Sequence, residues 1–181
     1  ATDYGGGVVF QNLLENDNVI LTESIVAGNS APTGSQVHIA AYPNTWQEGN
    51  SARTTISYSN VEMDDENDYF ESDAGITAWG DGMLNIDPGY VDNEAGDYRI
   101  LASSFLISAG HPDSTDADGS RSDLGAHPYE TDNNGTVWHV STEGSDSDGM
   151  GTESSPFKTI QAGINLASVG GTVTVAEGTY Q

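Results

Sequence analysis

The chain has 181 residues, and its 28 acidic side chains against 4 lysines and arginines give a formal net charge of −24. A nucleic-acid backbone or an anionic membrane surface is held by clustered cations, so this balance argues against both partners. Cysteine is absent, which removes disulfides, thiolate metal sites and cysteine nucleophiles. The 22 glycines and a hydrophobic content of 35% predict a turn-rich, mostly β chain with a modest core.

Short runs of β-branched and aromatic residues recur in the first part of the chain, bounded by Gly, Asn, Ser, Asp or Pro. They occupy residues 8–10, 19–21, 25–26, 37–39 and 54–58. Ile20, Ile39, Tyr58 and Ile76 recur at nearly equal spacings. This period predicts one coil of a β-solenoid, in which each coil pairs with the coils above and below it. An antiparallel sandwich with similar strand spacing is the alternative.

The pattern breaks at residues 62–68, an acidic run that reads as a solvated loop or a cation site. A strand is expected at residues 97–101, and residues 130–136 have the composition of a linker. We therefore predict three parts: residues 1–130, a linker at residues 131–136, and a separate segment at residues 137–181.

The last segment predicts a strand, a helix and a second strand. The first strand covers residues 137–141, and Ser155 followed by Pro156 is a typical helix start. Residues 170–171, both glycine, predict the end of the helix, and residues 172–175 alternate as a half-buried strand does. The spacing of four apolar residues places them on one helical face: Phe157, Ile160, Ile164 and Ala167.

Residues 137–180 resemble the start of a right-handed parallel β-helix of the pectate-lyase-like superfamily. The motifs that carry this resemblance are Trp138-His139-Val140-Ser141, Ser155-Pro156-Phe157-Lys158-Thr159-Ile160 and Glu177-Gly178-Thr179-Tyr180. In that family an amphipathic helix caps the solenoid, and the following strand opens the first coil. The resemblance implies an all-β fold made of parallel β-helix segments with one short capping helix.

Residues 1–130 resemble the opposite end of such a protein, with late coils and a closing module of the kind found in secreted bacterial β-helix proteins. The motifs that carry this likeness are Ala27-Gly28-Asn29-Ser30-Ala31, Asn85-Ile86-Asp87-Pro88-Gly89-Tyr90 and Asp118-Gly119-Ser120-Arg121. The end of one β-helix thus precedes the start of another, and a location outside the cell or on its surface is expected.

This order predicts unpaired strand edges at Val173 and Val175 and at Val8 and Phe10. An open edge is a template for association. The expected partners are adjacent repeats of a longer polypeptide or copies of this chain stacked head-to-tail, which gives a filament when the assembly does not close. The alternative is that the sequence is a piece of a longer protein.

Calcium is the expected cofactor, because alternating Asp side chains beside a glycine turn offer the oxygen ligands that it prefers. The candidate ligands are Asp113, Asp116, Asp118 and Asp123, with a shorter motif at Asp146 and Asp148. A solvated acidic turn is the alternative at each place. Cations would also screen the repulsion among so many carboxylates.

Catalysis has little support in the sequence, because a lyase of this fold requires a basic residue near its middle coils and Arg53 is the lone candidate. Exposed aromatic residues could instead stack on an extracellular polysaccharide; the candidates are Tyr42, Trp46, Tyr58, Tyr69, Phe70 and Trp79. The predicted function is that of an extracellular, cation-stabilised structural solenoid. A fragment of a polysaccharide lyase or glycoside hydrolase and a glycan-binding adhesin are the alternatives.

Overall fold

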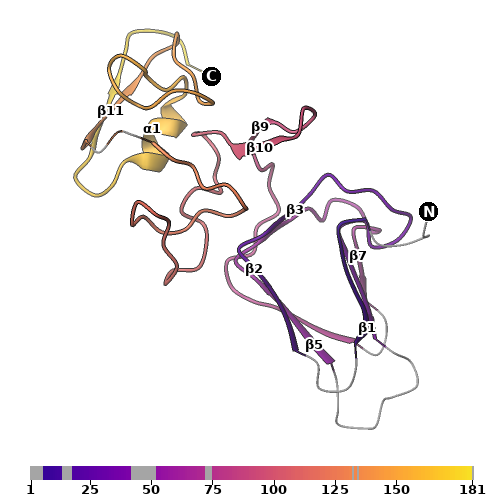
Figure 1. Ribbon diagram of the computed structural model, residues 1–181. Helices are drawn as coiled ribbons and strands as arrows, with labels where there is room; N and C mark the ends of the chain where they lie inside the picture. The colour runs from indigo at the N-terminus through magenta and orange to yellow at the C-terminus, as the bar shows by residue number, and fades with distance from the viewer. Residues whose placement is uncertain are drawn as a thin grey trace. The chain divides into compact units, whose positions relative to one another are not determined.

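The computed structural model describes residues 6–13, 18–41, 52–71, 75–131, 133 and 135–180. The chain divides into two compact units, which we call unit 1 (Ala1–Asp87) and unit 2 (Pro88–Gln181). Unit 1 consists mainly of strands, whereas unit 2 has short strands, long turn-rich segments and, in its described part, a single short helix (Figure 1). The predicted parallel β-solenoid with one short helix near the C-terminus is confirmed.

Unit 1 is built from parallel sheets in which successive strands come from successive coils (Figure 1). The sheets have the strand orders β1-β4-β7, β2-β5-β8 and β3-β6. The strands are β1 (Val8–Leu13), β2 (Asn18–Thr22), β3 (Ile25–Val26), β4 (Val37–Ala41), β5 (Ala52–Ser57), β6 (Asn60–Val61), β7 (Tyr69–Glu71) and β8 (Gly75–Trp79). The five β-type runs of the sequence lie in these strands except for Tyr58, which follows the end of β5, and the parallel pairing excludes the antiparallel sandwich.

The coils are longer than the chain between Ile20 and Ile39, so the predicted period was wrong. Val8 pairs with Val37, and Val37 in turn pairs with Tyr69, so each coil spans more of the chain than the predicted repeat. Ile20 and Ile39, which defined the short period, lie in different sheets, on β2 and β4. The period failed because one coil contributes strands of similar composition to more than one sheet.

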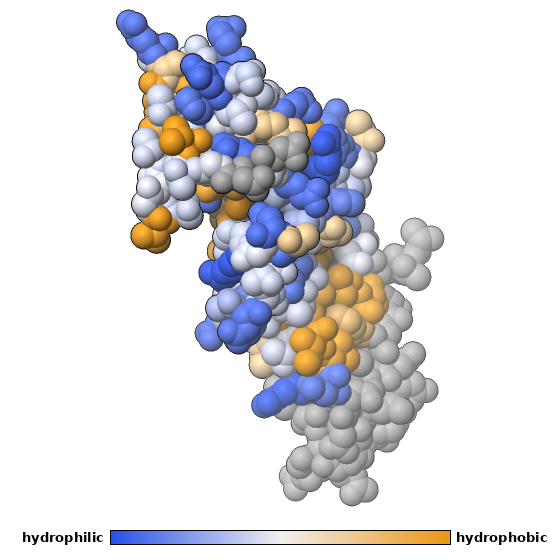
Figure 2. Space-filling model, turned by 60° about the vertical axis from the view of Figure 1, so that its left-hand side comes forward, coloured by the Kyte–Doolittle hydropathy of each residue, from blue (hydrophilic) through white to orange (hydrophobic). Residues whose placement is uncertain are grey.

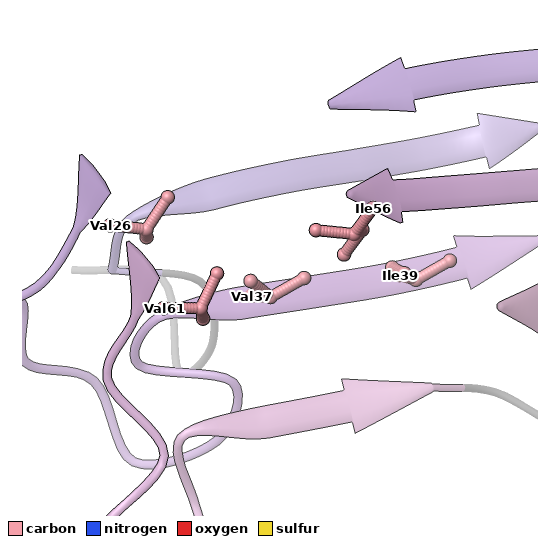
Figure 3. Close-up of a cluster of buried hydrophobic side chains, with 5 residues drawn as sticks. All are labelled: Val26, Val37, Ile39, Ile56 and Val61. Carbon is pink, nitrogen blue, oxygen red and sulfur yellow. The ribbon is translucent and has the colours of Figure 1, made fainter. Parts of the chain in front are cut away.

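The core of unit 1 lies between the sheets, where side chains from alternate positions meet (Figure 3). Val37, Ile39 and Ile56 have no exposed surface. Burying each such side chain contributes about 1.5–3 kcal/mol to the stability of the fold. Parallel stacking keeps these residues in columns because the side-chain period of a strand is two.

Polar side chains fix the turns from one coil to the next. Asn60 is fully buried, and its side-chain amide accepts a hydrogen bond from the Ile86 amide (3.0 Å) and donates one to the Ile86 carbonyl (2.9 Å). The amide of Glu23 donates to the carbonyl of Tyr58, whose own amide donates to the carbonyl of Asp81, each over 2.8 Å. These bonds tie equivalent turns of three coils together.

Unit 2 contains an antiparallel hairpin of β9 (Tyr90–Asp92) and β10 (Asp97–Ile100), which includes the strand expected at residues 97–101. It also contains a parallel pair of β11 (Val137–Val140) and β12 (Thr172–Val175). Both strands of this pair were predicted. The helix α1 (Ile160–Leu166) lies between them in sequence, and no described helix has the length and apolarity needed to cross a membrane.

The helix differs from the prediction at both ends. It begins after Thr159, whose side-chain oxygen accepts a hydrogen bond from the Ala162 amide over 3.2 Å, rather than at Ser155 and Pro156. It ends at Leu166, before the two glycines at residues 170–171. Phe157 comes too early to join the helix because its backbone is bonded to β11, as a parallel bridge to Val140 shows.

The predicted apolar face is buried only in part: Phe157 is fully buried and Ala167 packs against the core, although both lie outside α1. Ile160 and Ile164 are 38% and 55% exposed, whereas Ala162 and Gly163 face the core. A side chain at position 163 would collide with Val173 and Val140, since a Cβ there would lie 2.7 Å and 3.0 Å from their methyl groups. The helix therefore docks through its smallest residues.

The core of unit 2 joins the predicted closing module to the predicted cap. Trp138 stacks on Phe157 at 5.9 Å between ring centroids, and the buried Ala102 packs in the same cluster. The Asn165 side chain of α1 donates to the carbonyls of Ala102 (3.0 Å) and Ser104 (2.8 Å). Residues 131–136 accordingly lie inside unit 2, while the division of the chain between two solenoids at that segment remains a prediction.

Candidate functional site

The two candidate assembly edges are the outer sides of β1 and β12. β1 pairs with β4 on one side and β12 pairs with β11 on one side, and no described strand pairs with the other side of either. Thr172–Val175 therefore does not fold back onto a described strand of unit 1. Each edge has backbone groups that a further parallel strand could bind.

Apolar side chains face the core along both edges. Val8 and Phe10 are half-buried against the core of unit 1, and Val173 is half-buried against the core of unit 2. Val175, at 42% exposure, is in register with the buried Val140. The predicted edge residues thus occupy alternate, core-facing positions, and their outer surfaces are open to additional apolar contacts.

On both edges, the backbone groups of the core-facing residues point toward the coil that follows in the chain. The Val8 amide donates to the Gln36 carbonyl (2.8 Å), so the backbone of this core-facing residue points to the next coil. On β12 the Thr172 amide points back to β11, where it donates to the Thr136 carbonyl (2.7 Å). Because backbone direction alternates along a strand, the groups of Val173 and Val175 point away from β11, toward the position of a following coil.

Three of the predicted calcium ligands lie close together in unit 2. The Asp116 carboxylate accepts a hydrogen bond from the Asp123 amide (2.9 Å), and Asp118 accepts from the amide (2.8 Å) and the hydroxyl (2.6 Å) of Ser120. Asp113 is exposed, and its amide donates to a ring nitrogen of His111. These contacts are those of a polar turn stabilised by its own carboxylates.

Asp123 is buried, at 6% exposure, and its side chain links the segments that contain Ser108 and Tyr129. Its two carboxylate oxygens accept hydrogen bonds from the amides of Ser108 and Tyr129, each over 2.7 Å. Burial raises the pKa of Asp123, and the nearby charges of Asp116 and Asp118 act in the same direction, while the two amide bonds oppose the shift. Its carboxylate is therefore already engaged by the protein backbone.

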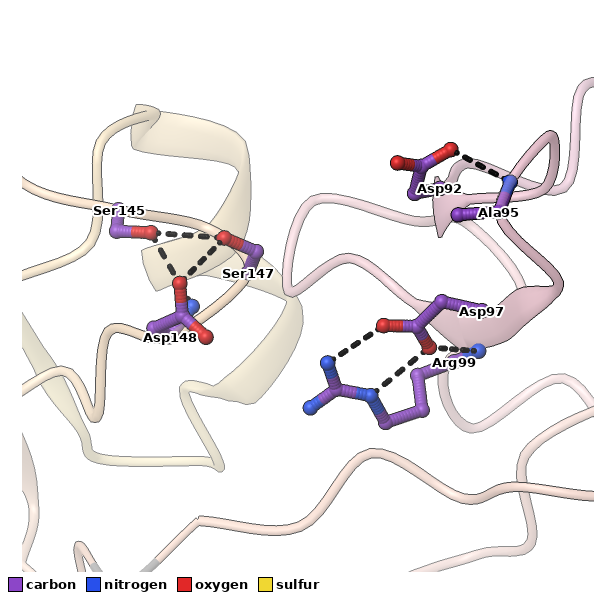
Figure 4. Close-up of polar contacts among 7 residues, drawn as sticks. All are labelled: Asp92, Ala95, Asp97, Arg99, Ser145, Ser147 and Asp148. Carbon is purple, nitrogen blue, oxygen red and sulfur yellow. Dashed lines mark hydrogen bonds and ion pairs between the residues drawn. The ribbon is translucent and has the colours of Figure 1, made fainter.

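Asp146 and Asp148, the second predicted pair of calcium ligands, have different contacts in the structure. Asp146 is buried, and its carboxylate accepts from the amides of Lys158 (2.8 Å) and Thr159 (3.1 Å) and from the Thr159 hydroxyl (2.7 Å). It therefore holds the segment that leads into α1. Asp148 is exposed and accepts a hydrogen bond from the neighbouring Ser147 hydroxyl (2.9 Å, Figure 4).

The acidic loop at residues 62–68 is organised by one buried carboxylate. Asp68 accepts from the Ser35 hydroxyl and from the amides of Asp64 (2.9 Å) and Asp65 (2.8 Å). The Ser35 bond is the main cause of a lowered pKa for Asp68. Within the described part of the chain, no group of three or more His, Asp or Glu side chains is placed to hold a metal ion, and calcium binding remains a prediction.

The basic residues have structural contacts or lie on the surface. Arg99 pairs with Asp97 at 2.7 Å (Figure 4), and the Arg121 guanidinium donates to the Gly110 carbonyl (2.8 Å from Nε). Arg53 is exposed on β5.

The described aromatic candidates are exposed or half-buried. Phe70 stacks on His38 at 4.7 Å, and Tyr69 meets the edge of Trp79, which is 41% exposed, at 5.2 Å. Tyr58 lies in a turn, and Tyr42 and Trp46 are outside the described residues. Apolar side chains also reach the surface elsewhere in the described chain (Figure 2). Ile164 of α1 is one of the exposed apolar residues.

Tyr129 is the residue that the sequence analysis missed. It lines three adjoining clefts of unit 2, with volumes of about 460, 340 and 290 Å³. Burial raises its pKa to about 12. The run around it, residues 126–131, has neither strand nor helix periodicity, so the sequence contained no signal that would place this ring in a cleft.

The comparisons with known proteins give one match. A family described as "Protein of unknown function (DUF1565)" matches residues 142–181, and this family is typical of parallel β-helix proteins. No curated protein and no solved structure matches the chain. The matched segment contains α1 and β12, so the comparison supports the β-helix assignment for the end of the chain where the sequence analysis placed a cap.

Proposed function

We propose that this chain is a structural element of an extracellular β-solenoid assembly in which copies stack head-to-tail. The outer edge of β12 in one copy would pair in parallel with the outer edge of β1 in the next. The proposal rests chiefly on one observation: core-facing residues of β1 and β12 direct their backbone groups along the solenoid in the same sense. β12 therefore has the same relation to a following coil as β1 has to β4.

One register satisfies both the side chains and the backbone. With Val173 opposite Val8 and Val175 opposite Phe10, the apolar columns of the two copies continue across the junction. The backbone N–H and C=O groups of Val8 point to β4, so those of Val9 point outward. In that register the outward backbone groups of β12 meet the outward backbone groups of β1, including those of Val9. Each backbone hydrogen bond formed this way contributes about 0.5–1.5 kcal/mol.

The assembly would be open-ended. The two edges are different surfaces, so each copy would use one for each neighbour, and such a heterologous contact gives a filament unless the rotation closes a ring. The net charge of −24 opposes the approach of copies. We therefore propose that cations, calcium among them, are required to screen the carboxylates during stacking.

The setting that we propose is the surface or exterior of a bacterial cell. The support is the resemblance of residues 137–180 to pectate-lyase-like β-helix proteins, together with the family match at residues 142–181. Polysaccharides of that environment are further candidate partners. A solenoid with few apolar residues and tightly bonded turns suits an extended, protease-resistant element better than a compact carrier.

The test is a substitution that removes an outward amide without removing any bond inside the chain. Val175→Pro takes away the N–H that would reach the next copy, while Val169→Pro makes the same change in a loop where the side chain is fully exposed. Sedimentation velocity and electron microscopy at raised ionic strength should show filaments for the wild type and for Val169→Pro, and single chains for Val175→Pro. A wild type that stays a single chain at every protein and salt concentration would refute stacking.

A further inference from the structure

Three adjoining clefts in unit 2 surround one aromatic side chain. The largest, of about 460 Å³, and its neighbour of about 340 Å³ share Asp118, Tyr129 and Thr131 in their walls. A third, of about 290 Å³, shares Tyr129 and Met150 with the first. Adjoining recesses around one ring could hold successive units of an oligomeric ligand.

The ring of Tyr129 is held in place by both of its ends. Its amide donates to Asp123 (2.7 Å), and its hydroxyl donates to the Gly149 carbonyl (2.9 Å). The ring also meets Phe157 of the core at 6.4 Å between centroids, with an interplanar angle of 62°. Because these contacts fix the aromatic wall in advance, a ligand would not have to order it on binding.

The walls of the two larger clefts combine apolar surface with negative charge, while Arg99, which pairs with Asp97, lines the third. Pro128 and Met150 flank the ring, and the carboxylates of Asp116, Asp118 and Glu130 line the largest cleft. No Lys, Arg or His is among the residues that line either of the two larger clefts. Hydrogen bonds from Ser120 lower the pKa of Asp118, so that carboxylate remains charged in mildly acidic solution.

We propose that the clefts around Tyr129 bind a cationic oligosaccharide composed of amino sugars. The flat C–H face of a sugar ring would lie on the tyrosine ring, and the carboxylates would accept hydrogen bonds from its ammonium and hydroxyl groups. Polyuronates are disfavoured because their carboxylates would face those of Asp116, Asp118 and Glu130. The site is separate from the proposed stacking edges, since neither Val173 nor Val175 lines any of the three clefts.

The experiment titrates the full chain with a fully deacetylated glucosamine tetramer and follows binding by calorimetry in mildly acidic buffer. Wild type should bind at one saturable site, and Asp118→Asn should weaken binding about tenfold, through loss of one charge-assisted contact. Glu94→Gln removes the same charge from an exposed turn and should leave the affinity within about twofold. Tyr129→Leu should abolish binding while Tyr129→Phe retains most of it, with thermal unfolding recorded to confirm that each variant is folded.

Four results would overturn the proposal. Equal weakening by Asp118→Asn and Glu94→Gln would show only general attraction of a polycation to an acidic chain. Equal binding of a lysine tetramer would show that no sugar ring is recognised. Equal binding of the N-acetylated tetramer would remove the need for a cation, and binding of a galacturonate tetramer would contradict the charge argument. Each is read in the same calorimetric titration.

Discussion

Asp146 gives the sharpest test of how carboxylates are used in this chain. Its side chain is 8% exposed and accepts three hydrogen bonds from Lys158 and Thr159, ahead of α1. Asp146→Ala would leave two backbone amides and a hydroxyl without their acceptor. A hydrogen bond to a charged group is worth about 1.5–3 kcal/mol, and bonds to one group are not additive, so we expect a loss of about 3 kcal/mol in the free energy of unfolding.

Urea unfolding in chelator and in calcium distinguishes a structural carboxylate from a metal ligand. The structural role predicts the same loss in both solutions, because the donors belong to the protein. Asp148→Ala is the matched control, since this exposed side chain accepts from its neighbour Ser147 and should cost within about 0.5 kcal/mol. A loss for Asp146→Ala below about 1 kcal/mol in chelator, or one that occurs with calcium alone, would refute this account.

Three further outcomes follow from the same structure. Ile56→Ala removes a fully buried side chain and should lower the free energy of unfolding in urea by about 2–5 kcal/mol. Ile20→Ala, at a position 63% exposed, should lower it by under about 1 kcal/mol. Similar losses for the two variants would contradict the placement of the core. Since the pKa of Asp68 is lowered, its ionised form stabilises the fold above the ordinary pKa of 3.8. In pH-dependent unfolding, the difference in free energy of unfolding between wild type and Asp68→Asn should shrink as the pH falls through and below that value. A difference that does not change with pH would contradict this. Chelation at fixed ionic strength should lower the melting temperature in a calorimeter if divalent cations screen the carboxylates, and an unchanged melt would reject that part of the proposal.

Sequence patterns predicted β1 to β5 and β10 to β12 because a strand has a local signature, whereas β6 to β9 were not predicted. The alternation at residues 172–175 and the β-branched runs of unit 1 needed no knowledge of distant contacts. The coil length could not be read in the same way. Ile20 and Ile39 look like equivalent residues, but which strand pairs with which depends on long-range hydrogen bonding that equal spacing does not report.

The helix and the acidic clusters show where local chemistry misleads. Ser155 and Pro156 are typical helix-start residues, yet Phe157 forms a parallel β-bridge with Val140 of β11. The first residues of the expected helix are therefore not helical. Asp123 and Asp146 have the spacing of oxygen ligands, but both accept backbone amides from segments far away in sequence. A carboxylate that caps the backbone and one that binds a cation have the same appearance in a sequence.

The unequal coils of unit 1 have a consequence for how such chains vary. The stretch of chain from Val8 to its partner Val37 is shorter than the stretch from Asn18 to its partner Arg53, yet both stretches advance the solenoid by one rung. Ladder hydrogen bonds fix the rise per rung at about 4.8 Å whatever the contour length between rungs. Extra residues can therefore be accommodated in loops at the side of the solenoid. New surface side chains can be introduced there while the axial repeat is preserved.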